Sequence, residues 1–241
     1  MFTVAERDRL RSDLVSAAHS DPRVVGAAVT GSAALDSEDR WSDIDFALSV
    51  DREMNAVVKD WTELLYACGA VGHLDVHHGA TLFRVFLMRT TLQVDVAFWP
   101  ADEFGASGPA FRVLFGETND VPRARQPDRG ELIGLAWLHA LHVRSSLARG
   151  RVWQALYMIN AMRDHVMSLR CLRQGVSAVQ GRGLDDLSDA GEFGGTLPLS
   201  THPEELLRAF RVLSGLLLGE VEDPQLAQTV RELTRGATVP R

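Results

Sequence analysis

Two aspartates, Asp43 and Asp45, flank a single isoleucine at the start of an apolar run that extends to Val50. The side chains of a strand alternate between its two faces, so residues two apart point the same way. The two carboxylates are therefore expected to project together while Ile44 points into a core. Neighbouring carboxylates resist ionising together unless a cation relieves their repulsion. Oxygen ligands of this kind suit Mg²⁺, which binds one or two carboxylates together with water and phosphate oxygens.

A glycine–serine pair, Gly31-Ser32, lies upstream of these acids and ends a β-branched apolar run over residues 24–29. The run is short enough to predict a buried strand. Taken alone, the pair predicts only a turn. A glycine also lets the backbone approach another group closely, so the pair gains meaning from the two acids that follow after a short spacer.

A third acid, Asp95, lies inside a further apolar run, residues 92–99. An acid among the apolar residues of a strand needs a partner. One interpretation is an ion pair with Arg84 on a neighbouring strand. The other is a place in one site with the two upstream acids, and their presence favours this second interpretation.

These three features together resemble the signature of the nucleotidyltransferase superfamily that shares its fold with DNA polymerase β. That signature is a Gly-Ser pair, a short spacer, Asp-x-Asp with apolar neighbours, and an acid from a later strand. The chain matches it with Gly31-Ser32, Asp43-Ile44-Asp45 and Gln93-Val94-Asp95-Val96-Ala97. A looser resemblance links residues 149–159 and 162–164 to the helical region of the aminoglycoside and lincosamide nucleotidyltransferases.

The resemblance implies an α+β protein with two domains. A mixed-sheet nucleotidyltransferase domain would span residues 1–125, and a helical bundle that binds the substrate would span residues 126–241. The implied reaction moves a nucleoside monophosphate, with AMP from ATP as the favoured case, to a hydroxyl of a small molecule. An aminoglycoside or lincosamide antibiotic is an acceptor of this kind, and antibiotic resistance is the role that such an acceptor implies.

The resemblance also implies a role for each matched residue. Gly31 and Ser32 would hold the β- and γ-phosphates of the nucleotide. Asp43 and Asp45 would bind one or two Mg²⁺ ions that bridge those phosphates. Asp95 would either complete the second metal site or accept the proton of the attacking hydroxyl.

The chain departs from its antibiotic-modifying relatives at one position. Relatives with a similar Trp-Gln-Ala stretch often carry an acid where this chain has Leu156. Its absence leaves the acceptor open among an aminoglycoside, a lincosamide and an unrelated metabolite. Nearby, Trp153 and Tyr157 either stack on a ring of the acceptor or pack the helices against each other.

Composition limits the class of protein. The 241 residues are 46% apolar and 24% charged, as is ordinary for a globular chain, and their net charge is −7. That charge disfavours a general nucleic-acid binder and leaves room for a cationic substrate. No signal-peptide core and no apolar run near the roughly 20 residues of a membrane span are found. Cys68 and Cys171 fit free thiols, so we expect a cytoplasmic protein without a membrane partner, and its oligomeric state stays open.

The surrounding sequence predicts the elements that hold these residues. Helices are predicted over residues 3–19, starting at a Thr3–Glu6 capping box, and over 51–67. Strands over 24–29, 44–50, 74–78, 82–88 and 92–98 would form a mixed sheet. Residues 100–127, rich in glycine and proline, predict a linker that phenylalanines pin to both domains, with the boundary near Arg125. Beyond it, helices over 128–149, 152–173, 203–218 and 224–235 predict a bundle of four or five helices.

Two other functions fit part of the pattern. Metal-dependent glycosyltransferases also use Asp-x-Asp to bind a nucleotide sugar, but they need neither the upstream Gly-Ser pair nor the later strand acid. A nucleotidyltransferase-like module without catalysis would only bind a nucleotide or a partner protein, and retention of all three acids argues against it.

Overall fold

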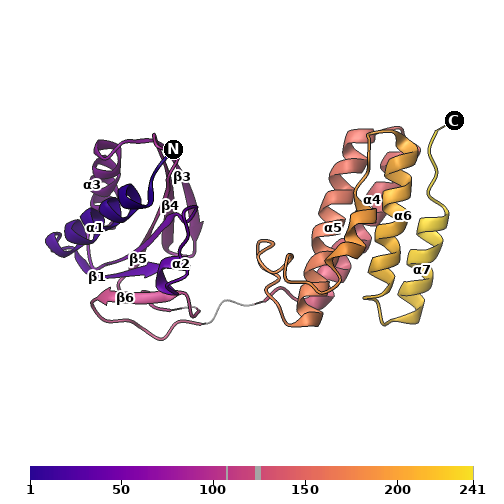
Figure 1. The fold of residues 1–241 in the computed structure, drawn as a ribbon. Coiled ribbons are helices and arrows are strands. Elements are labelled where there is room, and N and C mark those ends of the chain that lie inside the picture. The colour runs from indigo at the N-terminus through magenta and orange to yellow at the C-terminus, as the bar shows by residue number, and fades with distance from the viewer. Residues whose placement is uncertain (107, 123–125, 241) are drawn as a thin grey trace. The chain divides into compact units, whose positions relative to one another are not determined.

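The computed structural model describes residues 1–106, 108–122 and 126–240. The chain divides into two compact units, Met1–Ala124 and Arg125–Arg241. The first unit holds a sheet with helices, and the second holds helices alone (Figure 1). The predicted α+β class is therefore confirmed. The predicted boundary near Arg125 falls within residues 123–125, which lie outside the described residues.

The first unit is built on a six-stranded sheet with the strand order β3-β4-β5-β2-β1-β6. The strands are β1 (Val24–Thr30), β2 (Ile44–Val50), β3 (Ala70–His78), β4 (Thr81–Met88), β5 (Gln93–Pro100) and β6 (Phe111–Phe115). At its centre β2 and β5 are parallel, whereas the flanking pairs are antiparallel. The prediction of a mixed sheet is thus confirmed.

Two helices, α1 (Val4–Ser20) and α3 (Met54–Ala67), cover one face of this sheet (Figure 1). The capping box that starts α1 is present: the backbone N–H of Glu6 donates to the Thr3 hydroxyl, and the backbone N–H of Thr3 donates to the Glu6 carboxylate. The apolar residues of the central strands that alternate with the acids pack against these helices in one buried core. The helices therefore fill one face and leave the other face to the acids.

The opposite face of the sheet carries small side chains. Ala28, Ala47 and Ala97 are buried there beneath Phe104, and Phe111 packs against the same group. Small side chains on three neighbouring strands let the chain that follows β5 lie directly on the sheet.

The linker prediction for residues 100–127 is wrong in part. Residues 111–115 form β6, which pairs with the free edge of β1. Phe104, Phe111 and Phe115 all pack within the first unit. A five-residue strand between glycines and prolines has too little periodicity to be recognised, and its pairing is decided by the open edge that β1 presents.

The second unit is a helical bundle, as predicted. Its elements are α4 (Arg129–Ala148), α5 (Val152–Gln174), the 3₁₀ helix η1 (Ala190–Thr196), α6 (Pro203–Leu218) and α7 (Pro224–Arg235). Gly150, at φ 65°, turns the chain between α4 and α5, and Gly175, at φ 71°, ends α5. No helix in the described ranges is long and apolar enough to cross a membrane.

Candidate active site

Asp45 and Asp95 lie side by side at the centre of the sheet. The parallel register of β2 and β5 places Asp45 opposite Asp95. The residues that flank them on both strands are buried in the helix-side core, so both carboxylates project from the other face. Adjacent strands lie about 4.8 Å apart, and both side chains are half-buried. The sheet thus brings two of the predicted site residues together through backbone hydrogen bonds alone.

Asp43 reaches the same neighbourhood from a loop. It lies one residue before β2, at the end of the segment that follows the short helix α2 (Gly31–Ala34). Its charge raises the pKa of Asp95, so the two carboxyl groups interact across the site. In the part of the chain that the structure describes, no group of three or more His, Cys, Asp or Glu side chains is close enough to hold a metal ion. Register places Asp45 opposite Asp95, and the charge of Asp43 acts on Asp95 from the loop before β2.

Burial chiefly raises the pKa of Asp95 above the ordinary aspartate range, and the charge of Asp43 raises it further. The side-chain amide of Gln93 donates to Asp95 Oδ1 at 3.0 Å and acts in the opposite direction. Low dielectric and a like charge both penalise the ionised form. A divalent cation between the acids would stabilise their ionised forms and so lower the pKa of Asp95 again. The raised pKa is therefore what we expect of acids that share a cation site.

An ion pair between Asp95 and Arg84, the structural alternative, is wrong. Arg84 donates instead to both carboxylate oxygens of Asp75, at 2.6 Å each, and to the Thr62 hydroxyl at 2.5 Å. Arg84 and Asp95 stand in successive registers of the β4–β5 pairing, so their side chains leave opposite faces of the sheet. The Arg84 guanidinium therefore pairs with Asp75 on the helix side of the sheet. Asp95 lies on the opposite face, together with Asp45.

Gly31 is held against this pair. Its backbone is left-handed, with φ 62°, a conformation that glycine adopts without a steric penalty. A Cβ at this position would overlap Oδ2 of Asp45. Its N–H donates to the carbonyl of Ala110 at 3.2 Å, which fixes the turn at the edge of β1. The half-buried Ser32 follows it at the start of α2. The Gly-Ser turn and the Asp45 carboxylate are therefore in direct contact.

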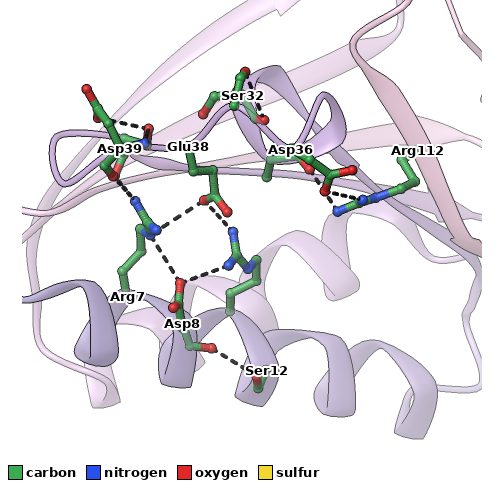
Figure 2. A network of polar contacts seen from close by, with 12 residues as sticks. Arg7, Asp8, Ser12, Ser32, Asp36, Glu38, Asp39 and Arg112 are labelled. Carbon is green, nitrogen blue, oxygen red and sulfur yellow. Dashed lines mark hydrogen bonds and ion pairs between the residues drawn. The ribbon is translucent and has the colours of Figure 1, made fainter.

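Arginines hold the loop between α2 and β2 at both ends (Figure 2). From β6, Arg112 donates to the Asp36 carboxylate at 2.7 Å and to the Ala33 carbonyl at 2.8 Å. From α1, Arg7 donates to the Asp39 carbonyl at 2.6 Å. Neither arginine was predicted to contact this loop. One signal was present, because Arg7 stands on the helical stripe that continues through Leu10 and Leu14 to the core.

Two aromatic residues on α5 of the second unit are exposed. Trp153 and Tyr157, one helical turn apart on α5, expose 73% and 68% of their surface. The interpretation that they pack the helical hairpin is therefore wrong, and stacking on an acceptor stays a prediction. Arg163, farther along α5, donates to the hydroxyl and the carbonyl of Thr196 at 2.7 Å each. Its guanidinium therefore holds η1 against α5.

The raised pKa of Asp95 predicts how stability changes with pH. When the folded-state pKa lies above the unfolded value, the stability that the proton provides is present at acid pH and is lost as the pH rises through the folded-state pKa. Asp95→Asn, which stays neutral, should match the wild-type unfolding temperature at acid pH and exceed it at neutral pH. Differential scanning calorimetry in EDTA would measure this difference.

Asp75→Asn is the matched control for that measurement. Hydrogen bonds from Arg84 lower the pKa of Asp75, so the stability from this acid is present above its unfolded pKa of about 3.9 and is lost as the pH falls through its folded-state value. Asp75→Asn should therefore destabilise the protein at neutral pH, in the opposite sense to Asp95→Asn. A wild-type protein more stable than Asp95→Asn at neutral pH would contradict the assigned cause.

Comparison with known proteins gives a likeness at the level of structure. No protein-family model and no curated protein matches the sequence. Among solved structures, the chain is similar to an aminoglycoside 6-adenyltransferase from Bacillus subtilis, with 13% sequence identity and a TM-score of 0.43. The match covers 96% of this chain and 98% of that chain.

Proposed function

We propose that the protein is a Mg²⁺-dependent nucleotidyltransferase that moves a nucleoside monophosphate, AMP from ATP, to a hydroxyl of a small molecule. One observation carries the proposal: Asp45 and Asp95 stand in register on parallel strands, and the Gly31 turn lies against the Asp45 carboxylate. A phosphate chain at this turn would lie beside two carboxylates. This arrangement gathers like charges, which a divalent cation would neutralise.

The residues present fit a divalent cation. Asp45 and Asp95 offer hard oxygen donors from neighbouring strands, and Asp43 adds a third carboxylate close enough to change the pKa of Asp95. Mg²⁺ binds one or two carboxylates and leaves other positions to water and phosphate oxygens, so these acids offer donors of the kind that it needs. When bound, the ion would neutralise charge on the triphosphate as the nucleotidyl group is transferred and pyrophosphate leaves.

The chain itself would orient the triphosphate and accept a proton. Gly31 has no side chain, so phosphate oxygens can approach its backbone closely, and the Ser32 hydroxyl can donate to them. As a ligand of the ion, Asp95 would complete the metal site. Outside the ion's coordination shell it would instead take the proton of the attacking hydroxyl, because burial and the charge of Asp43 raise its pKa. A raised pKa brings a carboxyl group closer to the operating pH and makes it a stronger general base.

Acceptor binding is assigned to the second unit. Trp153 and Tyr157 present two exposed rings on successive turns of α5, and exposed rings of this kind can stack on a cyclic acceptor. Both aminoglycosides and lincosamides are cyclic acceptors of this kind. The net charge of −7 favours a cationic acceptor over an anionic one.

The proposal is tested by incubating the intact protein with ATP and Mg²⁺ over a panel of aminoglycosides, lincosamides and hydroxylated metabolites. Pyrophosphate release that requires both Mg²⁺ and an acceptor is expected, with an AMP adduct of that acceptor by mass spectrometry. ATP binding by calorimetry without pyrophosphate release for any acceptor would instead indicate a non-catalytic binding module. Transfer of a sugar from a nucleotide sugar would indicate a glycosyltransferase.

A further inference from the structure

Arg7 is buried beneath the loop that leads into β2. Only 3% of its surface is exposed. Its Nη1 donates to the carbonyl of Asp39 at 2.6 Å and to the carbonyl of Ser42 at 3.3 Å. Figure 2 shows the guanidinium between helix α1 and this loop. One nitrogen therefore contacts two carbonyl groups of a four-residue turn, one at each end.

Side chains within the turn close it from inside. The Asp39 carboxylate accepts from the backbone N–H of Trp41 at 2.8 Å, and the Ser42 hydroxyl accepts from the backbone N–H of Asp39 at 2.9 Å. These bonds set the shape of the turn but do not attach it to the rest of the protein. α1 attaches this end through Arg7 to the two carbonyls and through Arg11 to Glu38, and Arg40 of the turn also donates to Met1 Sδ at 3.3 Å.

The Ser42 carbonyl belongs to the peptide group that joins Ser42 to Asp43. Because the peptide group is planar, a bond to its oxygen also restrains the nitrogen of Asp43. Asp45 and Asp95 need no such restraint, since β2 and β5 hold both of them by backbone pairing. Asp43 precedes β2 and lacks that support. The acid that the sheet does not hold is thus the one whose preceding peptide group is bonded to a buried arginine.

A second arginine, Arg11, shares the acidic partners of Arg7 but, among the residues that the structure describes, does not bond the loop carbonyls. Asp8 and Glu38 neutralise Arg7, with contacts of 3.3 and 3.5 Å from its Nε. Arg11 contacts the same two carboxylates, at 2.8 and 2.5 Å. The hydrogen bonds recorded for Arg11 in the described residues go to these carboxylates and to no loop carbonyl. The two arginines share their acidic partners, but only Arg7 bonds the peptide before Asp43.

We propose that Arg7 is a positioning residue for Asp43, and that it directs this carboxylate toward the Asp45–Asp95 pair for binding of a divalent cation. The inference rests on the proposed function, because it assigns a support to the same site. Residues that orient metal ligands from behind change metal affinity by about tenfold to a hundredfold when they are replaced. Loss of Arg7 should therefore weaken cation binding without altering any ligand.

Binding of Mn²⁺ tests the inference without a substrate. Titrations of the intact protein, followed by electron paramagnetic resonance of free Mn²⁺, would compare wild type, Arg7→Met, Arg7→Lys and Arg11→Met. Arg7→Met should weaken Mn²⁺ binding about tenfold or more. Arg7→Lys, which keeps the charge and can reach one carbonyl, should lie between it and wild type. Arg11→Met should bind Mn²⁺ like wild type although it removes contacts to the same acids.

In the transfer assay, the Arg7 variants should need more Mg²⁺ for half-maximal rate, and a large excess of Mg²⁺ should restore part of kcat. A general loss of stability would lower the active fraction but leave the required Mg²⁺ concentration unchanged. If Arg7→Met does not fold, the Mn²⁺ titration of Arg7→Lys tests the inference in its place.

Two results would overturn the inference while leaving the proposed function in place. One is wild-type Mn²⁺ affinity in the folded Arg7 variants. The other is an equal loss in Arg11→Met, which would assign the effect to the acidic partners and not to the carbonyl bonds. A wild-type protein that binds no Mn²⁺ and releases no pyrophosphate would instead refute the proposed function, and the inference would fall with it.

Discussion

Asp45→Asn is expected to abolish nucleotidyl transfer and to leave the fold intact. The amide has nearly the same size as the carboxylate, so the close fit against Gly31 is preserved. It lacks the negative charge with which Asp45 and Asp95 would together hold a divalent cation. A bound ion contributes several kcal/mol of charge stabilisation at a phosphoryl centre, and a loss of about 4 kcal/mol corresponds to about a 10³-fold lower kcat. Pyrophosphate release at saturating ATP and acceptor would measure this loss.

Asp75→Asn is the matched control for this variant. Asp75 is also an aspartate of a sheet strand, but it pairs with Arg84 on the helix side of the sheet. Its replacement should lower stability and leave kcat close to the wild-type value. Asp43→Asn should also lose activity, because the charge of Asp43 acts on Asp95 in the same site. Near wild-type turnover in Asp45→Asn would show that the assigned cation site is wrong.

Gly31→Ala is expected to impair both activity and stability. Alanine at φ 62° carries the penalty of a left-handed backbone, about 1–2 kcal/mol. Its Cβ would also overlap Oδ2 of Asp45 and displace the carboxylate from its position in the site. A displacement of about 1 Å at a reacting centre can cost about 10²-fold in rate. We therefore expect kcat to fall at least that far, together with a lower unfolding temperature.

Gly79→Ala separates these two effects. Gly79 lies in the turn between β3 and β4 with φ 61°, nearly the same backbone angle as Gly31, and a Cβ there would meet no atom within 4 Å. The variant should therefore lose similar stability from backbone strain while its kcat stays near that of wild type. If Gly31→Ala lost only as much activity as Gly79→Ala, the contact between the Gly-Ser turn and Asp45 would have no catalytic importance.

Local patterns in the sequence predicted much of the architecture. Alternation of apolar residues identified β2 and β5, because a strand with one buried face repeats every two residues. Helical periodicity identified α4, α5, α6 and α7, and the spacing of Thr3 and Glu6 predicted how α1 begins. The same local pattern marked Asp45 and Asp95 as acids in apolar strands. These features depend on residues close together in the chain, so they can be recognised without a fold.

Partners distant in the chain could not be recognised in this way. The strand β6 exists because β1 offers an open edge, and its own five residues hardly predict it. Arg84 could have paired with Asp95 on a neighbouring strand, but the register of β4 turned it toward Asp75. A shift of one residue reverses the face of every side chain in a strand, and register is a property of the assembled sheet.

The types of the candidate site residues and their order along the chain were thus readable from the amino acids, because the acids interrupt runs whose periodicity is local. Folding alone set Asp45 opposite Asp95, pressed Gly31 against one of them, and placed Arg7 under the peptide that precedes Asp43. The physical reason is that strand register and the burial of a long side chain depend on contacts between segments separated by tens of residues. No local pattern specifies such contacts before the chain has packed.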